Sequence, residues 1–292
     1  MRLHKTNRRW FRVGLAACAF AALLNFLSTE FGHQAGSHAA ASAANNRVTS
    51  SQEPGFENYD IRTAKSSDAA QFIVTARESL GVSTGRVANT REDFHTGEAQ
   101  LRQRVPTLKV EYNEESATPE VIAPDVWGEA RTLTGPASGI KNAETLRNFI
   151  RENNSLIGVS DIQASQLKVT ADYTNPNGDL SYAHLEQFIN GVPVFRGEVK
   201  AGFNRQGEMF RVINNLAPGL DYDRLSTDFG DPVQAVRVAF TKVTRPMTAD
   251  DTTRNDAAST DLRTVFGGGD WATTAEKMYF PTEPGVAVAP TV

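Results

Sequence analysis

Histidine and cysteine, which supply most protein metal sites and many catalytic nucleophiles, are scarce in this sequence. After residue 43 only His95 and His184 remain, and the single cysteine is Cys18. A zinc peptidase of the common kind needs two histidines four positions apart on a helix, with a glutamate beside the first to activate water. His184 is followed by Leu-Glu-Gln-Phe instead. We therefore expect no catalytic residues, no metal site and no cofactor in this chain.

One serine lies in a pattern that hydrolases use for their nucleophile. Residues 81–85 read Gly-Val-Ser-Thr-Gly, and in such enzymes the serine follows a strand and precedes a helix. Here a helix is expected before Ser83 and polar sequence after it, so Gly81 is better explained as the residue that ends that helix. The sequence thus indicates no catalytic motif, and whether the chain is an enzyme stays uncertain.

The body of the chain is acidic. The 292 residues include 30 Lys/Arg and 34 Asp/Glu, a net charge of −4. Residues 1–43 hold five of the basic residues and one of the acids, which leaves 25 basic and 33 acidic residues and a net charge of −8. Affinity for phosphate backbones comes mainly from clustered Lys and Arg. The charge balance therefore argues against a nucleic-acid partner.

The N-terminus has the pattern of an export signal. Basic residues precede an apolar run at 13–27, which is shorter than the about 20 residues that a membrane-spanning helix needs. Ala41 and Ala43 fit the A-x-A cleavage pattern that follows such a run. We expect a secreted or periplasmic protein that meets the membrane only through this segment, with an uncleaved anchor as the alternative.

The centre of the chain predicts an α+β fold in which a helix packs on an antiparallel β-meander. The apolar residues of residues 143–157 recur at helical spacing and fall on one face. Strand-like runs follow it, and two of them are joined by Asn190-Gly191, the strongest short hairpin signal. The predicted strands are residues 166–173, 181–189, 192–204 and 208–216.

The flanking segments carry weaker patterns. A leader at 44–104 is polar and poor in aromatic residues, so we expect it to be poorly ordered around one helix. After the meander, Asp231-Pro232 has the pattern of a helix start, and residues 244–270 are polar enough for a linker or mobile loop. The other predicted elements are a helix at 68–80, a strand at 107–112, turn-rich sequence between that strand and residue 142, a helix at 231–243, a strand at 277–280 and a strand-like run at 286–289.

The third strand of the meander indicates how the sheet packs, because apolar and charged residues alternate along it. Successive side chains of a strand point to opposite faces, so one face is expected to be covered by the helix and the other to be wet. The predicted buried face holds Phe195, Val199, Ala201 and Phe203, and the predicted wet face holds Arg196, Glu198 and Lys200.

The meander resembles the propeptide of the fungalysin/thermolysin peptidases. Residues 185–220 read LEQFINGVPVFRGEVKAGFNRQGEMFRVINNLAPGL, which looks like that signature in its G-V-P-V-F block, its G-E pair and its N-N-L strand. The resemblance extends over about residues 105–289, with the C-terminal part similar to a cystatin-like lobe of the PepSY type. The matching residues are His184, Gln187, Gly191, Val192, Pro193, Val194, Phe195, Gly197, Glu198, Asn204, Gly207 and Asn214.

This resemblance implies a function that needs no catalytic residues. Such prosegments act as intramolecular chaperones and inhibitors of a secreted zinc metallopeptidase, whose catalytic domain binds the zinc and is the implied partner, in cis or in trans. The implied organisation is a signal peptide at 1–43, a leader at 44–104, a propeptide lobe at 105–220 and a PepSY-like lobe at 221–292.

Two interpretations of the chain stay open. It ends where a peptidase domain would begin, so it is either a prosegment without its catalytic domain or a stand-alone exported module that inhibits proteases or binds peptides on a cystatin-like scaffold. The uncharged tail from residue 279 either lies extended along a partner's cleft or forms a terminal hairpin. The candidate protease contacts are Arg196, Glu198, Lys200, Tyr279, Phe280 and Pro281.

Overall fold

The computed structural model describes Arg62 and residues 66–125, 127–128, 131–137, 139–242 and 245–289. All of them belong to one compact unit, residues 56–292. The expected signal peptide, with Ala41 and Ala43, lies outside the described residues. Among those described, no helix has the length and apolar character to cross a membrane. The lobe boundaries expected from the sequence stay predictions.

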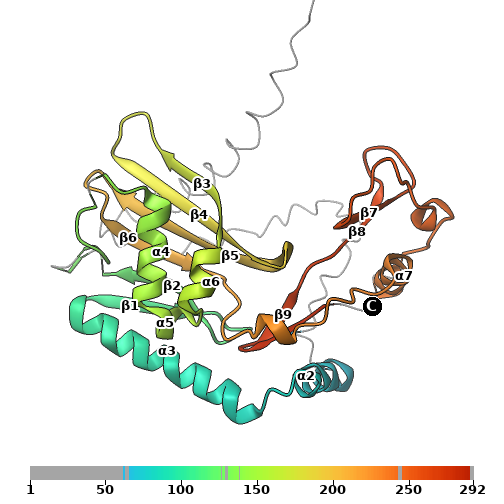
Figure 1. Cartoon of the computed structure of the whole chain (residues 1–292), viewed down its shortest axis with the longest axis horizontal. Helices are drawn as coiled ribbons and strands as arrows, with labels where there is room; N and C mark the ends of the chain where they lie inside the picture. The colour runs from blue at the N-terminus through green and yellow to red at the C-terminus, as the bar shows by residue number, and fades with distance from the viewer. Residues whose placement is uncertain are drawn as a thin grey trace, which may run out of the picture. The chain divides into compact units, whose positions relative to one another are not determined.

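A six-stranded antiparallel sheet forms the centre of this unit, with helices on one of its faces (Figure 1). Helix α4 (Asn142–Glu152) packs against β3 and β4, and the short α5 (Asn154–Ile157) and α6 (Asp161–Gln166) lie beside it. This arrangement confirms the expected α+β class. The strand order is β1 (Leu108–Tyr112), β2 (Pro119–Pro124), β6 (Met209–Asn214), β5 (Val192–Asn204), β4 (Leu180–Ile189) and β3 (Lys168–Thr174).

The predicted meander is confirmed as β3 to β6, with the third strand at the predicted residues. The Asn190-Gly191 turn has φ values of +52° and +83°, the left-handed conformation that a tight hairpin requires. Strand β2 was not expected, because a proline stands at each end of a six-residue run. It pairs with β1 and β6 and so places residues 108–124 in the same sheet.

The predicted amphipathic helix is present but is interrupted at Asn153. Helix α4 ends there and α5 follows, while the buried amide of Asn153 donates to the carbonyl of Phe149 at 2.7 Å. At the helix start, Asp172 of β3 accepts from the backbone N–H of Ala143 at 3.1 Å. The sheet therefore supplies a bond that caps the helix, and this tertiary contact fixes the helix against β3.

The leader contains a helix that the sequence analysis misses. After α2 (Ser67–Ser79), α3 (Thr84–Arg104) runs for 21 residues and buries Phe94 and Leu101 completely. Its apolar residues Val87, Phe94 and Leu101 are seven positions apart, so they share one face of an otherwise polar helix. Residues 84–104 are thus part of the fold rather than a loosely attached leader.

The junction between these helices explains the hydrolase-like pattern. Gly81 follows α2 with φ +62°, the left-handed conformation typical of a residue that ends a helix. Ser83 caps α3, because its side-chain oxygen accepts from the backbone N–H of Arg86 at 3.1 Å. The serine therefore has a structural role between two helices, as the sequence analysis preferred.

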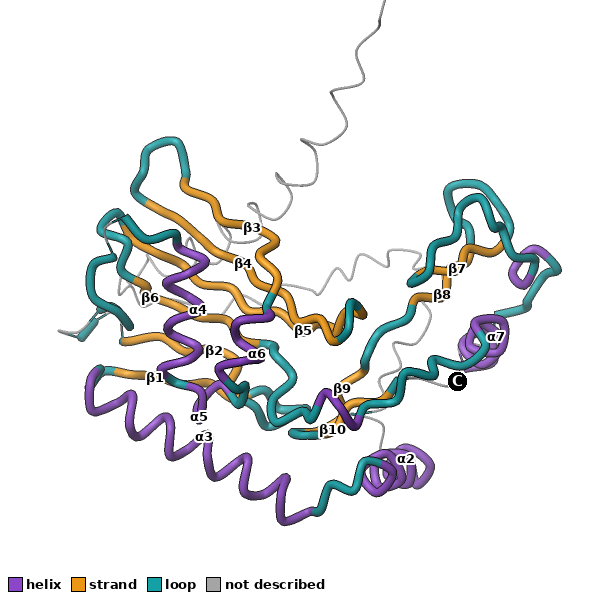
Figure 2. Tube along the Cα trace, viewed as in Figure 1, coloured by secondary structure: helices purple, strands orange, loops and turns teal. Residues whose placement is uncertain are grey.

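The C-terminal region, residues 222–289, is built from short elements joined by loops (Figure 2). Helix α7 starts as predicted, with the Asp231 carboxylate accepting from the Val233 N–H at 3.0 Å. The sequence predicts a linker or mobile loop at residues 244–270, whereas the structure has η2 and β7 in this segment. The elements are η1 (Tyr222–Arg224), α7 (Pro232–Lys242), η2 (Asp250–Thr252), β7 (Arg263–Phe266), β8 (Thr273–Glu276), β9 (Phe280–Glu283) and β10 (Val286–Val288).

The tail forms a hairpin, which decides between the two expectations for it. Strands β9 and β10 pair across Pro284-Gly285, and Val286 and Ala287 are buried. Strand β9 begins at Phe280, whereas the sequence predicts a strand at 277–280, because Tyr279 bonds to β5 instead. Its N–H donates to the Pro193 carbonyl at 2.9 Å, and its carbonyl accepts from the Phe195 N–H at 2.8 Å.

Candidate functional site

The G-V-P-V-F-R-G-E block forms a bulge in the sheet. Glu198 pairs with Glu186 and Pro193 pairs with Phe188, so residues 194–197 of β5 lie opposite Gln187 alone. Arg196 adopts φ +52° there, a conformation that glycine usually fills. A Cβ on Gly197 would lie 2.7 Å from the Val194 Cβ, so the position leaves no room for a side chain.

The bulge corrects the predicted alternation of β5. Val199, Ala201 and Phe203 are buried in the main core as expected. Phe195 was assigned to the same face, but the extra residues turn it away from that core. Its ring instead packs on Phe280 at 5.2 Å between ring centroids. The alternation of residues along a strand does not reveal a change of face at a bulge, because strict alternation assumes one residue per pleat.

Gln187 connects the sheet to the loop that follows β6. Its side chain is 1% exposed, and its amide both donates to the Ala217 carbonyl at 3.2 Å and accepts from the Ala217 N–H at 2.8 Å. The same amide nitrogen donates to the Tyr222 hydroxyl at 2.9 Å. Because burial dominates around that phenol, the pKa of Tyr222 is raised. The polar atoms of this glutamine therefore hold the backbone of Ala217 and the hydroxyl of Tyr222 in place.

Two asparagines of the motif also bind backbone. Asn214 is 2% exposed and donates to the Pro119 carbonyl of β2 at 2.8 Å. Asn204 closes the β5–β6 turn, since its side-chain oxygen accepts from the Glu208 N–H at 3.0 Å, and Gly207 in that turn has φ +74°. Val192 and Pro193 are half-buried, and Val194 is buried in a smaller cluster with Tyr279. The motif thus encodes the shape of the meander.

An ion-pair network lies on the sheet face opposite α4. Glu198 binds His184 Nε2 at 2.8 Å and Lys200 Nζ at 2.6 Å, and Glu186 lies 3.9 Å from the imidazole. The His184 contact is short but not aligned as a hydrogen bond, and it is an ion pair only when the imidazole is protonated. The contacts with His184 and then Lys200 outweigh burial and lower the pKa of Glu198 to about 2.

This network brings together a set of potential metal ligands. Atoms of His184, Glu186 and Glu198 lie within 4.8 Å of one another. Lys200 occupies the second oxygen of Glu198, and an ammonium group beside a cation site disfavours metal binding by like-charge repulsion. A network of ion pairs accounts for these side chains, and we assign no metal to them.

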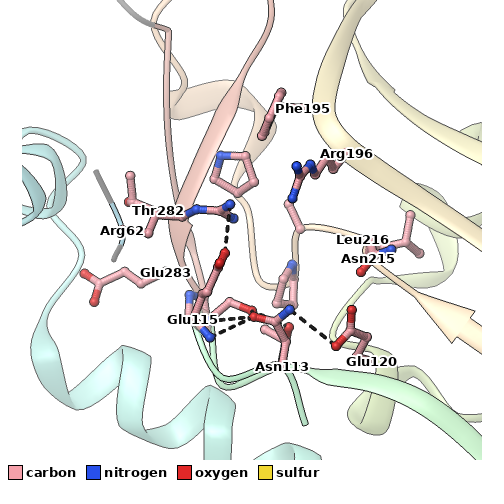
Figure 3. A pocket seen from close by; sticks show the side chains of 16 residues that line it. Arg62, Asn113, Glu115, Glu120, Phe195, Arg196, Asn215, Leu216, Thr282 and Glu283 are labelled. Carbon is pink, nitrogen blue, oxygen red and sulfur yellow. Dashed lines mark hydrogen bonds and ion pairs between the residues drawn. The ribbon is translucent and has the colours of Figure 1, made fainter. Parts of the chain in front are cut away.

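A pocket of about 140 Å³ lies beside the bulge (Figure 3). Its walls are the β1–β2 loop at 113–118, the bulge with Phe195 and Arg196, the segment 215–218 and the β9–β10 hairpin at 281–284. Arg62 closes one side and binds Glu115 at 3.0 Å. The loop is held in shape by Asn113, whose side-chain oxygen accepts from the backbone N–H of Glu115 at 2.9 Å.

The structure gathers part of the predicted contact set at this pocket. Arg196 and Pro281 line it, and Phe280 lies between Phe195 and the Arg62 guanidinium. Tyr279 is 1% exposed and therefore cannot reach a partner, which corrects that expectation. Glu198 and Lys200 belong to the ion-pair network. No sequence signal indicates the pocket, because its walls come from segments that only the tertiary fold assembles.

Comparison with known families agrees with the geometry of the meander. Residues 165–216 match the family model described as Fungalysin/Thermolysin Propeptide Motif. The match runs from the end of α6 through β6 and includes every motif residue named above. This segment is therefore similar to the propeptide motif of the fungalysin/thermolysin-type peptidases, as the resemblance predicts. No curated protein matches the chain.

Proposed function

We propose that this chain is the prosegment of a secreted zinc metallopeptidase of the fungalysin type, which helps the catalytic domain to fold and inhibits it until release. A propeptide role and an association with a peptidase catalytic domain follow from the motif at 165–216. The observation that carries the finer proposal is that this motif coincides with a complete meander, β3 to β6, whose buried polar residues Gln187 and Asn214 hold its shape.

The sheet face opposite α4 is the surface that we assign to the peptidase. Tyr173 and Tyr182 are 42% and 37% exposed there, and their rings pack at 5.5 Å. The His184–Glu198–Lys200 network continues the surface along β4 and β5. Exposed tyrosines surrounded by paired charges are typical of protein interfaces, where aromatic rings supply affinity and charges supply register.

The C-terminal region supports the comparison with a second, PepSY-like lobe. Helix α7 packs on the β7–β8 hairpin, and Val236, Phe240 and Phe266 form a buried cluster of their own. We propose that this lobe and the bulge, with Arg196, Phe280 and Pro281, border the contact with the catalytic domain. Export through the N-terminal segment at 1–43 belongs to the same proposal.

The test adds the purified chain to a fungalysin-type catalytic domain in trans and measures peptide hydrolysis and the yield of refolding. The chain must include α3, because Leu101 shares the core of the sheet. We expect inhibition with a dissociation constant from about nanomolar to micromolar, the range of interfaces of ordinary size. Absence of both inhibition and refolding assistance would reject the proposal.

A matched pair of variants locates the surface. Lys200→Glu reverses a charge on the proposed face, and Lys141→Glu reverses one at the start of α4, on the helix side. We expect the first to weaken inhibition about tenfold and the second to leave it unchanged. A stand-alone inhibitor, the alternative, would inhibit peptidases of unrelated classes and would not raise the refolding yield of the fungalysin-type domain.

A further inference from the structure

The pocket beside the bulge is lined by two arginines, Arg62 and Arg196, and by the carboxylates of Glu115, Glu120 and Glu283. Glu115 pairs with Arg62 at 3.0 Å, and Glu283 pairs with Arg77 at 3.4 Å. Arg196 is exposed and, within the described part of the chain, forms no ion pair; its guanidinium carbon lies 5.3 Å from the centroid of the Phe195 ring.

Two walls of the pocket have an unusual backbone. Among the described residues other than glycine, only Ala117, Asn190 and Arg196 have positive φ. Asn190 is accounted for by its hairpin turn, whereas Ala117 and Arg196 lie in the β1–β2 loop and the bulge, which face each other across the pocket (Figure 3). Backbone strain that the surrounding structure maintains is concentrated at binding sites. In this structure the strained backbone of the bulge holds the Arg196 guanidinium at the pocket.

The size and lining of the pocket restrict what can enter it. A cavity of about 150 Å³ holds one benzene molecule, so a pocket of about 140 Å³ has room for one side chain. Phe195, Pro218 and Pro281 line it with apolar surface, and Asn113 and Glu120 are bonded to each other at 3.4 Å. The Glu120 carboxylate lies on the β2 side of the pocket, so a ligand needs an apolar stem and a group that complements the guanidinium on the bulge side.

We propose that this pocket binds the side chain of an Asp or Glu residue of a partner polypeptide, with Arg196 binding the carboxylate. A guanidinium binds a carboxylate through two parallel N–H···O bonds, which gives geometric selectivity that a point charge lacks. That the partner is the peptidase catalytic domain rests on the proposed function. The preference of the pocket for an acidic side chain does not depend on the proposed function.

The test titrates the isotope-labelled full chain with three blocked tripeptides and follows the backbone amide signals by nuclear magnetic resonance. The probes are acetyl-alanyl-glutamyl-alanine amide, its glutaminyl counterpart, and acetyl-trialanine with a free terminal carboxylate. We expect the glutamyl peptide to bind at least about tenfold more tightly than the other two. Its shifts should concentrate at Asn113, Arg196 and Asn215, which line the pocket.

Variants connect the binding to Arg196. Arg196→Gln should remove the advantage of the glutamyl peptide, Arg196→Lys should keep part of it, and Arg211→Gln, which changes an exposed arginine on β6, should leave it intact. Arg196→Gly suits the positive φ and provides a second charge-free variant if the glutamine variant fails to fold.

Several outcomes would overturn the proposal. Equal affinity for the glutamyl and glutaminyl peptides, shifts away from the pocket, or no binding at millimolar peptide would each reject the site. Preference for the peptide with the free terminal carboxylate would show that the pocket binds chain ends instead. Because no peptidase is present in this experiment, its failure leaves inhibition in trans as a separate question.

Discussion

The sheet region, from α3 to β6, and the C-terminal region hold themselves together in different ways. In the sheet region one continuous cluster of buried residues runs from Leu101 to Leu216 and joins helices and strands. In the C-terminal region the strands have three or four residues. Val236, Phe240 and Phe266 form a small cluster of their own, whereas Tyr279 and Ala287 share a cluster with Ile189 and Val194 of the sheet. The first region is stabilised mainly by its own apolar core, and the second depends on apolar contacts and hydrogen bonds with the first.

The hydrogen bonds between the two regions are specific. Gln187 bonds to Ala217 and Tyr222, the backbone of Tyr279 bonds to β5, and the Gly285 N–H donates to the Pro218 carbonyl at 2.8 Å. The pocket with Arg196 lies where these links meet. The comparison therefore predicts that damage to the core unfolds the whole unit, whereas damage to the links releases the C-terminal region and the pocket.

The largest effect is expected from emptying the core at α3. Phe94→Ala removes a completely buried ring and should lower the free energy of unfolding by about 3–5 kcal/mol. Phe72→Ala is the matched control, since Phe72 is 37% exposed on α2 and its loss should cost less than about 1 kcal/mol. Urea unfolding followed by circular dichroism measures both. Equal costs would mean that α3 is a loose leader after all.

The next effect tests a link between the two regions. Gln187→Ala leaves the N–H and the carbonyl of Ala217 buried without partners, which should cost about 2–3 kcal/mol. Hydrogen exchange should rise at Ala217 and Gly219 while Ala183 in β4 stays protected. Gln206→Ala, an exposed glutamine in the β5–β6 turn, should change neither measurement. Equal loss of protection throughout β4 would show that no separate link exists.

A third, smaller effect concerns the contact of α3 with α5. A Cβ on Gly97 would lie 2.4 Å from the backbone nitrogen of Leu156. Gly97→Ala should therefore cost about 1–3 kcal/mol of overpacking, although alanine favours the helix. In the same helix, Gly85 is exposed with its nearest neighbour at 3.7 Å, so Gly85→Ala should be neutral or stabilising. The midpoint of thermal unfolding should fall for Gly97→Ala and stay the same or rise for Gly85→Ala.

The sequence predicts the sheet region better because its signals are local. The Asn190-Gly191 turn, the alternation at 199–203 and the helical spacing at 146–157 each indicate an element without knowledge of the rest of the fold. Helix α3 is missed because its buried residues occur once in two turns, so the mean composition is polar. Strand β2 is missed because prolines stand at both ends.

The C-terminal region and the pocket depend on contacts between distant residues. The Asp251 carboxylate accepts from the hydroxyl groups of Thr248 and Thr273 at 2.7 Å, which joins η2 to the start of β8. In sequence these are ordinary polar loop residues. Arg196 is recognisable as a charge on a strand, but its position at a pocket requires the bulge, the β1–β2 loop and the tail together.

The smallest effect on stability is expected on the sheet surface, where the variant removes a charge and not a buried apolar group. The pKa of Glu198 is lowered to about 2, because of His184 first and Lys200 second, from an ordinary value near 4.5. A carboxyl group with a lowered folded-state pKa stabilises the fold above its unfolded pKa and loses that contribution as the pH falls toward the folded pKa. The window for Glu198 is therefore from about pH 4.5 down to about pH 2.

Glu198→Gln should lower the free energy of unfolding at pH 7 by about 1–2 kcal/mol, after allowance for solvent screening of a partly exposed pair. The difference from the unmodified chain should shrink below pH 4.5 and vanish near pH 2, because both proteins then lack the charge. Glu186→Gln is the control, since Glu186 lies 3.9 Å from His184, whereas Lys200 pairs with Glu198. Glu186→Gln should lower the free energy of unfolding at pH 7 less than Glu198→Gln does, because its contact with His184 is longer. A Glu198 variant with an unchanged pH profile would mean that the surface network contributes nothing to stability, and its charges would then matter only for the partner.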